Sequence, residues 1–137
     1  MTDGTAGVVL DASALLAYLQ DERGGEMVEA ALVTGIINVV NYAEVLSRLS
    51  DTGEEPAAAH RRLQDQGLVD GLLEVVPLDE ADAVAIARLR ATTRAQGLSL
   101  GDRACLATAL RFGRPVLTTD RAWATVDVGV SVQLIRP

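Results

Sequence analysis

The sequence contains no lysine, and all twelve of its basic residues are arginines. This absence excludes several classes of protein that place acidic residues at the ends of strands. A P-loop needs its lysine to hold phosphates, and Schiff-base chemistry needs a lysine amine. Receiver domains and phosphatases of the haloacid-dehalogenase type resemble the chain in outline, but they also depend on a lysine. None of these functions is therefore expected.

Cysteine, histidine and aromatic residues are also scarce. The single cysteine, Cys105, excludes an internal disulfide and a cysteine-based metal site. It lies between Ala104 and Leu106, so we expect a small buried side chain. The single histidine, His60, lies in a polar-faced helical stretch without a second histidine, which disfavours a zinc or catalytic role. Aromatic residues make up 3% of the chain, so the sequence predicts a core of Leu, Val, Ile and Ala.

Long apolar runs are absent as well. No stretch of eighteen apolar residues occurs, and no basic segment followed by an apolar one resembles a signal peptide. We therefore expect a soluble, cytoplasmic protein without a membrane partner. The length suits one domain over residues 1–137, with its core from about 7 to 136. Hydrophobic residues make up 49% of the chain, enough to bury a sizeable core.

Short apolar runs alternate with segments of helical periodicity along the whole chain. This alternation predicts a single α/β domain of three α/β/α layers, with a mainly parallel central sheet covered on both faces. The predicted strands are 7–10, 36–40, 72–76, 116–118 and 130–135, the last at an edge. The predicted helices are 13–20, 26–33, 43–49, 56–66, 79–96 and 99–112, and 120–125 is a loop or one helical turn.

Asp11 follows the first predicted strand directly, in the stretch GVVLDASALLAYLQ. In an open parallel sheet, ligands bind just outside the carboxyl ends of the strands. Asp11 would lie there. Asp is also a good helix N-cap, and a helix begins at this point. The stretch alone does not choose between a ligand-binding and a capping role.

Glu44 and Asp120 also lie near the ends of sheet elements, and Asp102 opens an apolar helix that could pack beside them. Capping boxes would by themselves explain Asn41-x-x-Glu44 and Ser99-x-x-Asp102. However, converging carboxylates repel one another and are costly to bury unless a cation neutralises them. Mg²⁺ and Mn²⁺ prefer such oxygen ligands. Two such ions can clamp the attacking and leaving oxygens of a phosphodiester.

Four segments, taken in this order and spacing, resemble a PIN-domain nuclease, and most of all the VapC-type toxins of toxin–antitoxin pairs. They are VLDASALLAYL, NYAEVLSRL, LSLGDRACLATA and VLTTDRAW. The resemblance extends from about Val8 to Ile135. It implies that Asp11, Glu44, Asp102 and Asp120 are catalytic, that Asp11, Asp102 and Asp120 hold the metal, and that Ser13, Asn41 and Thr118 support them. Asp127 is a further acid, for which a solvated loop position is favoured.

The function that the resemblance implies is an endoribonuclease dependent on Mg²⁺ or Mn²⁺, with a metal-activated water as the nucleophile. It further implies a structured RNA substrate such as tRNA or rRNA, inhibition by a cognate antitoxin of VapB type, and a homodimer. Two alternatives stay open. One is a PIN-like nuclease that acts in RNA processing or on DNA, although DNA-directed relatives usually have longer chains with helical arches. The other is a non-catalytic binding module, which the presence of all four acids disfavours.

The net charge of −7 opposes binding of RNA phosphates unless cations act locally. Arg103 and Arg121 each follow a proposed metal ligand directly. An arginine fork suits a phosphate, so we expect both to meet the substrate near the metals. Ordinary surface solvation is the alternative for both. The acidic surface would also suit a basic antitoxin segment.

Overall fold

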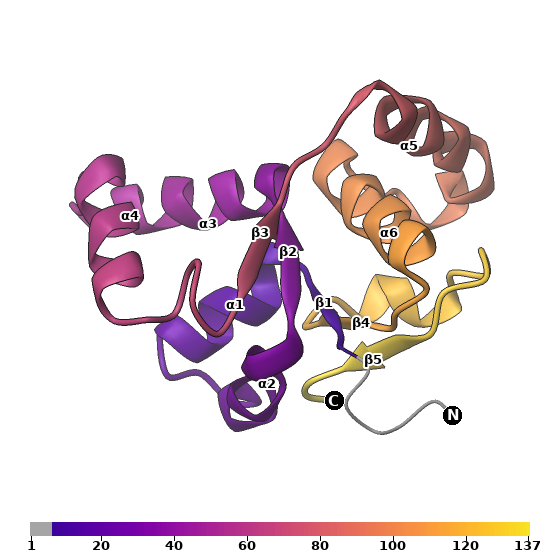
Figure 1. Ribbon diagram of the computed structural model, residues 1–137. Helices are drawn as coiled ribbons and strands as arrows, with labels where there is room; N and C mark the ends of the chain where they lie inside the picture. The colour runs from indigo at the N-terminus through magenta and orange to yellow at the C-terminus, as the bar shows by residue number, and fades with distance from the viewer. Residues whose placement is uncertain (1–6) are drawn as a thin grey trace.

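The computed structural model describes residues 7–137. Its centre is a sheet of five parallel strands in the order β3-β2-β1-β4-β5. From β1 the chain builds outward to β2 and β3, and then crosses to β4 and β5 on the other side (Figure 1). The strand order therefore reverses between β1 and β4, which is where open parallel sheets bind ligands. The strands are β1 (Val9–Leu10), β2 (Ile36–Asn38), β3 (Glu74–Val76), β4 (Val116–Thr118) and β5 (Val132–Leu134).

Helices cover both faces of the sheet. In Figure 1, α3 and α4 lie to the left of the sheet, and α5 and α6 lie to its right. The predicted three-layer α/β/α arrangement with a parallel sheet is confirmed. The helices are α1 (Ala12–Leu19), α2 (Gly25–Ala31), α3 (Val39–Asp51), α4 (Pro56–Asp65), α5 (Glu80–Thr92) and α6 (Leu100–Phe112), with 3₁₀ turns η1 (Leu32–Thr34), η2 (Arg94–Gln96) and η3 (Arg121–Thr125).

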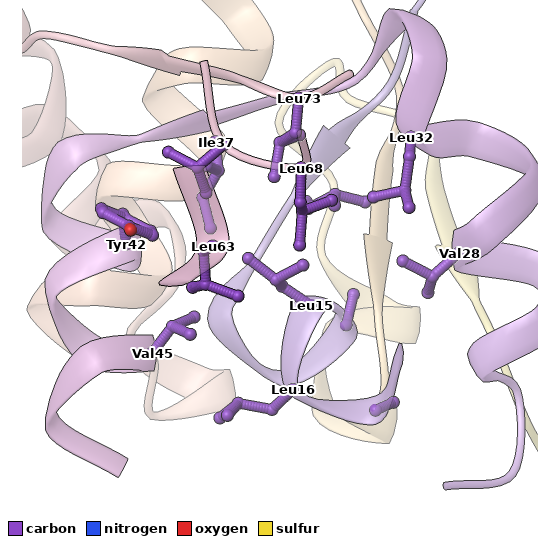
Figure 2. Close-up of a cluster of buried hydrophobic side chains, with 14 of the residues drawn as sticks. Leu15, Leu16, Val28, Leu32, Ile37, Tyr42, Val45, Leu63, Leu68 and Leu73 are labelled. Atoms are coloured by element: carbon purple, nitrogen blue, oxygen red, sulfur yellow. The ribbon is translucent and has the colours of Figure 1, made fainter. Parts of the chain in front are cut away.

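The three central strands divide their side chains between two buried clusters. Leu10, Ile37 and Leu117 belong to the cluster that packs against α1 to α4, part of which Figure 2 shows. Their neighbours in sequence, Val9, Ile36 and Val116, belong to the cluster under α6. This alternation follows from the two-residue period of a strand, and burial on both faces is typical of parallel sheets. Each such side chain contributes about 1.5–3 kcal/mol through burial.

The core is mainly aliphatic, as the composition predicts, but Trp123 is its largest fully buried side chain. Tyr42 is also buried, at 5% exposure. An exclusively aliphatic core was therefore a wrong expectation. Trp123 is buried because η3 packs this single indole against the cluster beneath α6. Cys105 is fully buried on α6, as expected.

The second strand is shorter than the sequence predicts. Val39 and Val40 are β-branched, but they form the first turn of α3 and are 45% and 37% exposed. The Asn38 side chain caps this helix by accepting a hydrogen bond from the backbone N–H of Asn41 at 2.8 Å. A favourable N-cap therefore overrides the strand preference of the two valines.

Other element boundaries differ from the prediction as well. The predicted strand at 7–10 is reduced to Val9–Leu10, and the one at 130–135 to Val132–Leu134. The predicted helix at 79–96 ends at Thr92 and continues only as η2. Over residues 7–137, none of the helices is both long enough and apolar enough to cross a membrane.

Candidate functional site

A pocket of about 540 Å³ opens at the carboxyl ends of β1 and β4, where the strand order reverses. The structure brings the four predicted acids together in its lining. Asp11 comes from the end of β1, Glu44 from α3, Asp102 from α6 and Asp120 from the end of β4. Segments separated by more than a hundred residues therefore present carboxylates to one open cavity.

Asp11 lies in the most enclosed position of the four. Its side chain is the N-cap of α1, with Oδ1 accepting from the backbone N–H of Ala14 at 2.8 Å and from the Ser13 hydroxyl at 2.7 Å. Oδ2 accepts from the Thr118 hydroxyl. The residue is 5% exposed, and this burial raises the pKa of Asp11 to about 6 against the lowering effect of its hydrogen bonds. The negative charge of Asp102 adds to the rise in pKa. Asp11 thus both caps a helix and lines the pocket.

Thr118 and Ser13 connect the ends of β1 and β4. The Thr118 hydroxyl accepts a hydrogen bond from the backbone N–H of Asp120 at 3.1 Å while it donates to Asp11. The Ser13 hydroxyl accepts from the backbone N–H of Thr119 at 3.0 Å. These bonds fix the Asp11 carboxylate relative to the loop that carries Asp120. The two predicted supporting hydroxyls are therefore in contact with the acids.

Glu44 lies in the second turn of α3 and is held there by Asn41. The Asn41 amide donates to Glu44 Oε1 at 2.7 Å and to the Gly101 carbonyl at 2.9 Å. The capping-box alternative for Asn41 and Glu44 is wrong, because the cap of α3 is Asn38. Glu44 also packs closely on α6: a Cβ on Gly101 would lie 2.6 Å from Glu44 Oε1. The absence of a side chain at Gly101 therefore makes room for this carboxylate.

Asp102 and Asp120 each cap a helical segment with one oxygen. Asp102 Oδ2 accepts from the backbone N–H of Ser99 at 3.0 Å, and the Ser99 hydroxyl accepts from the backbone N–H of Asp102 at 3.1 Å, so the predicted capping box is present. Asp120 Oδ1 accepts from the backbone N–H of Ala122 at 2.9 Å. The second oxygen of each carboxylate accepts no hydrogen bond from the described residues. Capping and pocket lining are thus compatible roles for both acids.

The carboxylates that line the pocket are of the ligand type that divalent metal ions bind. The pocket offers carboxylate oxygens, which Mg²⁺ and Mn²⁺ prefer. Asp11 is buried beside the negative charge of Asp102 and makes no ion pair within residues 7–137, so its ionised form lacks a cation. In the side-chain arrangement over the same residues, no three of the His, Cys, Asp or Glu side chains lie close enough together to hold one ion. The assignment of the metal to Asp11, Asp102 and Asp120, which line the pocket from three different elements, therefore stays a prediction.

The two arginines that the sequence places next to the metals lie elsewhere. Arg103 points away from the acids: its guanidinium donates to the Ile86 carbonyl at 3.0 Å and lines a separate hollow. Arg121 is exposed on η3 and does not line the acidic pocket. Asp127 is also exposed and outside the pocket, in agreement with the favoured solvated role.

The cations that do line the acidic pocket are Arg48 and Arg136, which the sequence did not indicate. Arg48 follows Glu44 by four residues on α3, so helical spacing could have placed it on the same face. Arg136 lies near the end of the chain and reaches the pocket only through tertiary packing. Its guanidinium lies 3.3 Å from Glu22 Oε1, and Glu22 is a fifth carboxylate in the lining.

Comparison with known proteins defines the class of this fold and site. Residues 8–129 match the family model of the PIN domain, and the chain therefore belongs to the PIN-domain family. No curated protein matches it by sequence.

Solved structures resemble the chain over nearly its whole length. VapBC-5 from Mycobacterium tuberculosis, a member of the VapBC family of toxin–antitoxin systems, is 29% identical at a TM-score of 0.59, covering 96% of this chain and 99% of that chain. A toxin–antitoxin complex from Klebsiella pneumoniae is 18% identical at a TM-score of 0.68, covering 90% and 95%. FitAcB from Neisseria gonorrhoeae is 21% identical at a TM-score of 0.69, covering 91% and 95%. The resemblance to VapC-type PIN proteins is thus confirmed at the level of family and fold.

Proposed function

We propose that this PIN-domain protein is the toxin of a VapBC-type pair and acts as a cytoplasmic, metal-dependent endoribonuclease. The observation that carries the proposal is the convergence of Asp11, Glu44, Asp102 and Asp120 on one pocket at the point where the strand order reverses. The pocket is lined by carboxylates, and neither lysine nor histidine is among its lining residues. Such a lining favours hydrolysis by an activated water over attack by a protein nucleophile.

We assign different roles in the proposed hydrolysis to different residues of the pocket. Asp11, Asp102 and Asp120 would hold Mg²⁺ or Mn²⁺, whose chemistry when bound is to activate water and to offset charge on the phosphate. Thr118 and Ser13 orient Asp11 through their hydroxyls. Hydrolysis breaks the bond between phosphorus and O3′, so the products carry a 5′-phosphate and a 3′-hydroxyl.

Glu44 is suited to receive a proton. Asn41 donates to its Oε1 at 2.7 Å, while Oε2 accepts no hydrogen bond within the described residues, and the residue lines the pocket. A carboxylate with one oxygen held and the other free can orient an attacking water and take up its proton. We assign this role to Glu44.

The proposed partners follow from the family and from the neighbours. Because VapBC-5 and the Klebsiella pneumoniae structure are toxin–antitoxin proteins, we propose a cognate antitoxin of VapB type for this chain. A basic antitoxin segment would fit the acidic pocket, since arginine pairs bidentately with carboxylates. We further propose a homodimer and a structured RNA substrate, such as tRNA or an rRNA loop.

A cleavage assay with matched variants tests this function. The purified protein is incubated with total tRNA and rRNA in Mn²⁺, beside Glu44→Gln and the control Asp127→Asn, which removes an exposed acid outside the pocket. We expect wild type and Asp127→Asn to leave 5′-phosphate ends. Glu44→Gln should lose at least about a hundredfold in rate, the contribution typical of general acid–base catalysis. Its melting temperature should change little, because Glu44 caps no helix. Equal rates for Glu44→Gln and wild type would remove Glu44 from the mechanism, and cleavage of duplex DNA alone would favour the DNA-directed alternative.

A further inference from the structure

A second hollow of about 650 Å³ contains an unusual concentration of positive charge for a chain of net charge −7. Three arginines line it: Arg90 from α5, Arg94 from η2 and Arg103 from α6. The rest of its lining is made of Thr, Ser, Gly and Leu residues, and no carboxylate contributes. The hollow therefore offers three guanidinium groups and no internal counterion.

The three arginines are also without ion-pair partners. Within residues 7–137, none of them lies within 4 Å of a carboxylate, whereas Arg48, Arg62, Arg111 and Arg136 do. Arg103 uses one nitrogen to bind the Ile86 carbonyl at 3.0 Å, and its Nε is buried with no hydrogen-bond partner among the described residues. Like charges that share a hollow repel one another, and an unpaired buried donor costs free energy. An anion bound in the hollow would relieve the repulsion among the three guanidinium groups.

The hollow lies next to the acidic pocket, on the other side of the first turn of α6. Ser99 lines the hollow and Asp102 lines the pocket, and the two residues exchange hydrogen bonds at 3.0 and 3.1 Å. Consecutive residues of this turn thus face different cavities, Asp102 the acidic one and Arg103 the basic one. A strand whose scissile phosphate lies at the acidic pocket can continue directly past the arginines.

We propose that this hollow binds backbone phosphates of the RNA substrate beside the cleavage site. The proposal rests on the proposed ribonuclease function and adds to it the site that holds the anionic strand. Arginine forks bind phosphate oxygens bidentately, and proteins that bind single strands use a basic groove along the backbone. Such a site would let a chain of charge −7 bind RNA, because its cations are gathered beside the acidic pocket.

The test compares two double variants that have the same net charge. Arg90→Gln with Arg94→Gln removes two guanidiniums from the hollow. Arg61→Gln with Arg88→Gln removes two arginines that lie outside both cavities. Glutamine keeps the helix propensity at all four positions. Binding of a fluorescein-labelled hairpin RNA is measured by anisotropy in EDTA, which prevents cleavage, at low and at moderate NaCl concentration.

We expect the hollow variant to bind the hairpin more weakly. The slope of its log affinity against log salt should be smaller by about 1 for each phosphate that it no longer neutralises. In Mn²⁺ its KM should rise while kcat stays close to that of wild type, because the acids are intact. The control variant should retain most of the affinity and slope. An unchanged slope in the hollow variant, or an equal reduction in the control, would overturn the proposal.

A thermal melt with sodium tripolyphosphate separates this proposal from the proposed function. If wild type neither binds nor cleaves RNA, the ribonuclease assignment fails. The hollow still stands as a phosphate site if tripolyphosphate raises the melting temperature of wild type and of the control but not of the hollow variant. Equal shifts in all three proteins would reject it. Loss of antitoxin binding with unchanged RNA binding would instead make the hollow a protein-binding surface and would also reject it.

Discussion

The Thr118 hydroxyl donates to Oδ2 of Asp11 and thereby joins the ends of β1 and β4, two strands that are neighbours in the sheet although the two residues are 107 positions apart in the chain. The Thr118 hydroxyl oxygen also accepts a hydrogen bond from the backbone N–H of Asp120 at 3.1 Å. One side chain therefore orients a buried acid and positions the loop that carries a second acid. We therefore expect the chemistry of the pocket to depend on this side chain.

Replacing Thr118 by valine should remove the hydrogen bond while keeping the shape of the side chain. Asp11 is then without a hydrogen bond that lowers its pKa, so the pKa should rise above about 6. The Asp120 N–H is also left without its acceptor, and we expect stability to fall by about 1–3 kcal/mol. The rising limb of the pH–rate profile in Mn²⁺ should move to higher pH. Thr125→Val, at an exposed position of η3, is the control, and an unmoved profile would contradict the role of Thr118.

Asp11→Asn should stabilise the metal-free protein in a pH-dependent manner. Burial raises the pKa of Asp11 from 3.8 to about 6. The stability that the protonated form provides is fully present below the unfolded pKa and is lost as the pH rises through about 6. Above that pH, ionised Asp11 costs wild type about 3 kcal/mol, at 1.36 kcal/mol per pH unit, and asparagine avoids this cost.

Urea unfolding in EDTA from pH 4 to pH 8 measures this effect. The variant should be more stable than wild type at pH 8, and the difference should shrink through pH 6 and disappear near pH 4. Asp127→Asn should show no such trend. A difference that is constant with pH would mean that Asp11 is not the group that titrates. In Mn²⁺, the same Asp11→Asn variant should lose nearly all RNA cleavage.

Gly101→Ala should impair catalysis more than stability. The new Cβ would lie 2.6 Å from Glu44 Oε1, so the flexible carboxylate must move away from its position beside Asn41. Alanine is also favoured over glycine in a helix by about 0.8–1 kcal/mol, which offsets strain in α6. We expect a cleavage rate reduced by roughly tenfold or more and a melting temperature within a few degrees of wild type. Wild-type activity in this variant would show that the position of Glu44 is unimportant.

Divalent ions should stabilise the folded protein through the acidic pocket. A ligand at a hundredfold excess over its Kd contributes about 2.7 kcal/mol when it binds only the native state. Mn²⁺ should therefore raise the melting temperature of wild type, and much less that of the double variant Asp11→Asn, Asp102→Asn. Equal shifts in both proteins would place the ions elsewhere and would remove the metal from the proposed mechanism.

The sequence by itself determined the layers of the fold and the acids of the pocket. Val9 and Leu10, like Ile36 and Ile37, pack into clusters on opposite faces of the sheet because a strand has a two-residue period. The capping box of Ser99 and Asp102 spans one helical turn, and its two residues identify it. Parallel strands bring their carboxyl ends to one edge, so Asp11 and Asp120, which follow strands, converge there. The resemblance to the PIN family added Glu44 and Asp102, which lie in helices. All of these features depend on interactions between near neighbours or on a general rule of sheets.

Only the tertiary structure decided the directions of the long side chains and the start of α3. Asn38, not Asn41, caps α3, because the strand ends where its pairing with Val76 of β3 ends. Arg103 was expected beside the metals, but the packing of α5 against α6 turns its guanidinium to the Ile86 carbonyl. Arg136 reaches the acidic pocket because the end of the chain returns to Glu22. An arginine side chain has several rotatable bonds, so its neighbours depend on which surfaces the packed helices bring within its reach, and the sequence around it does not contain that information.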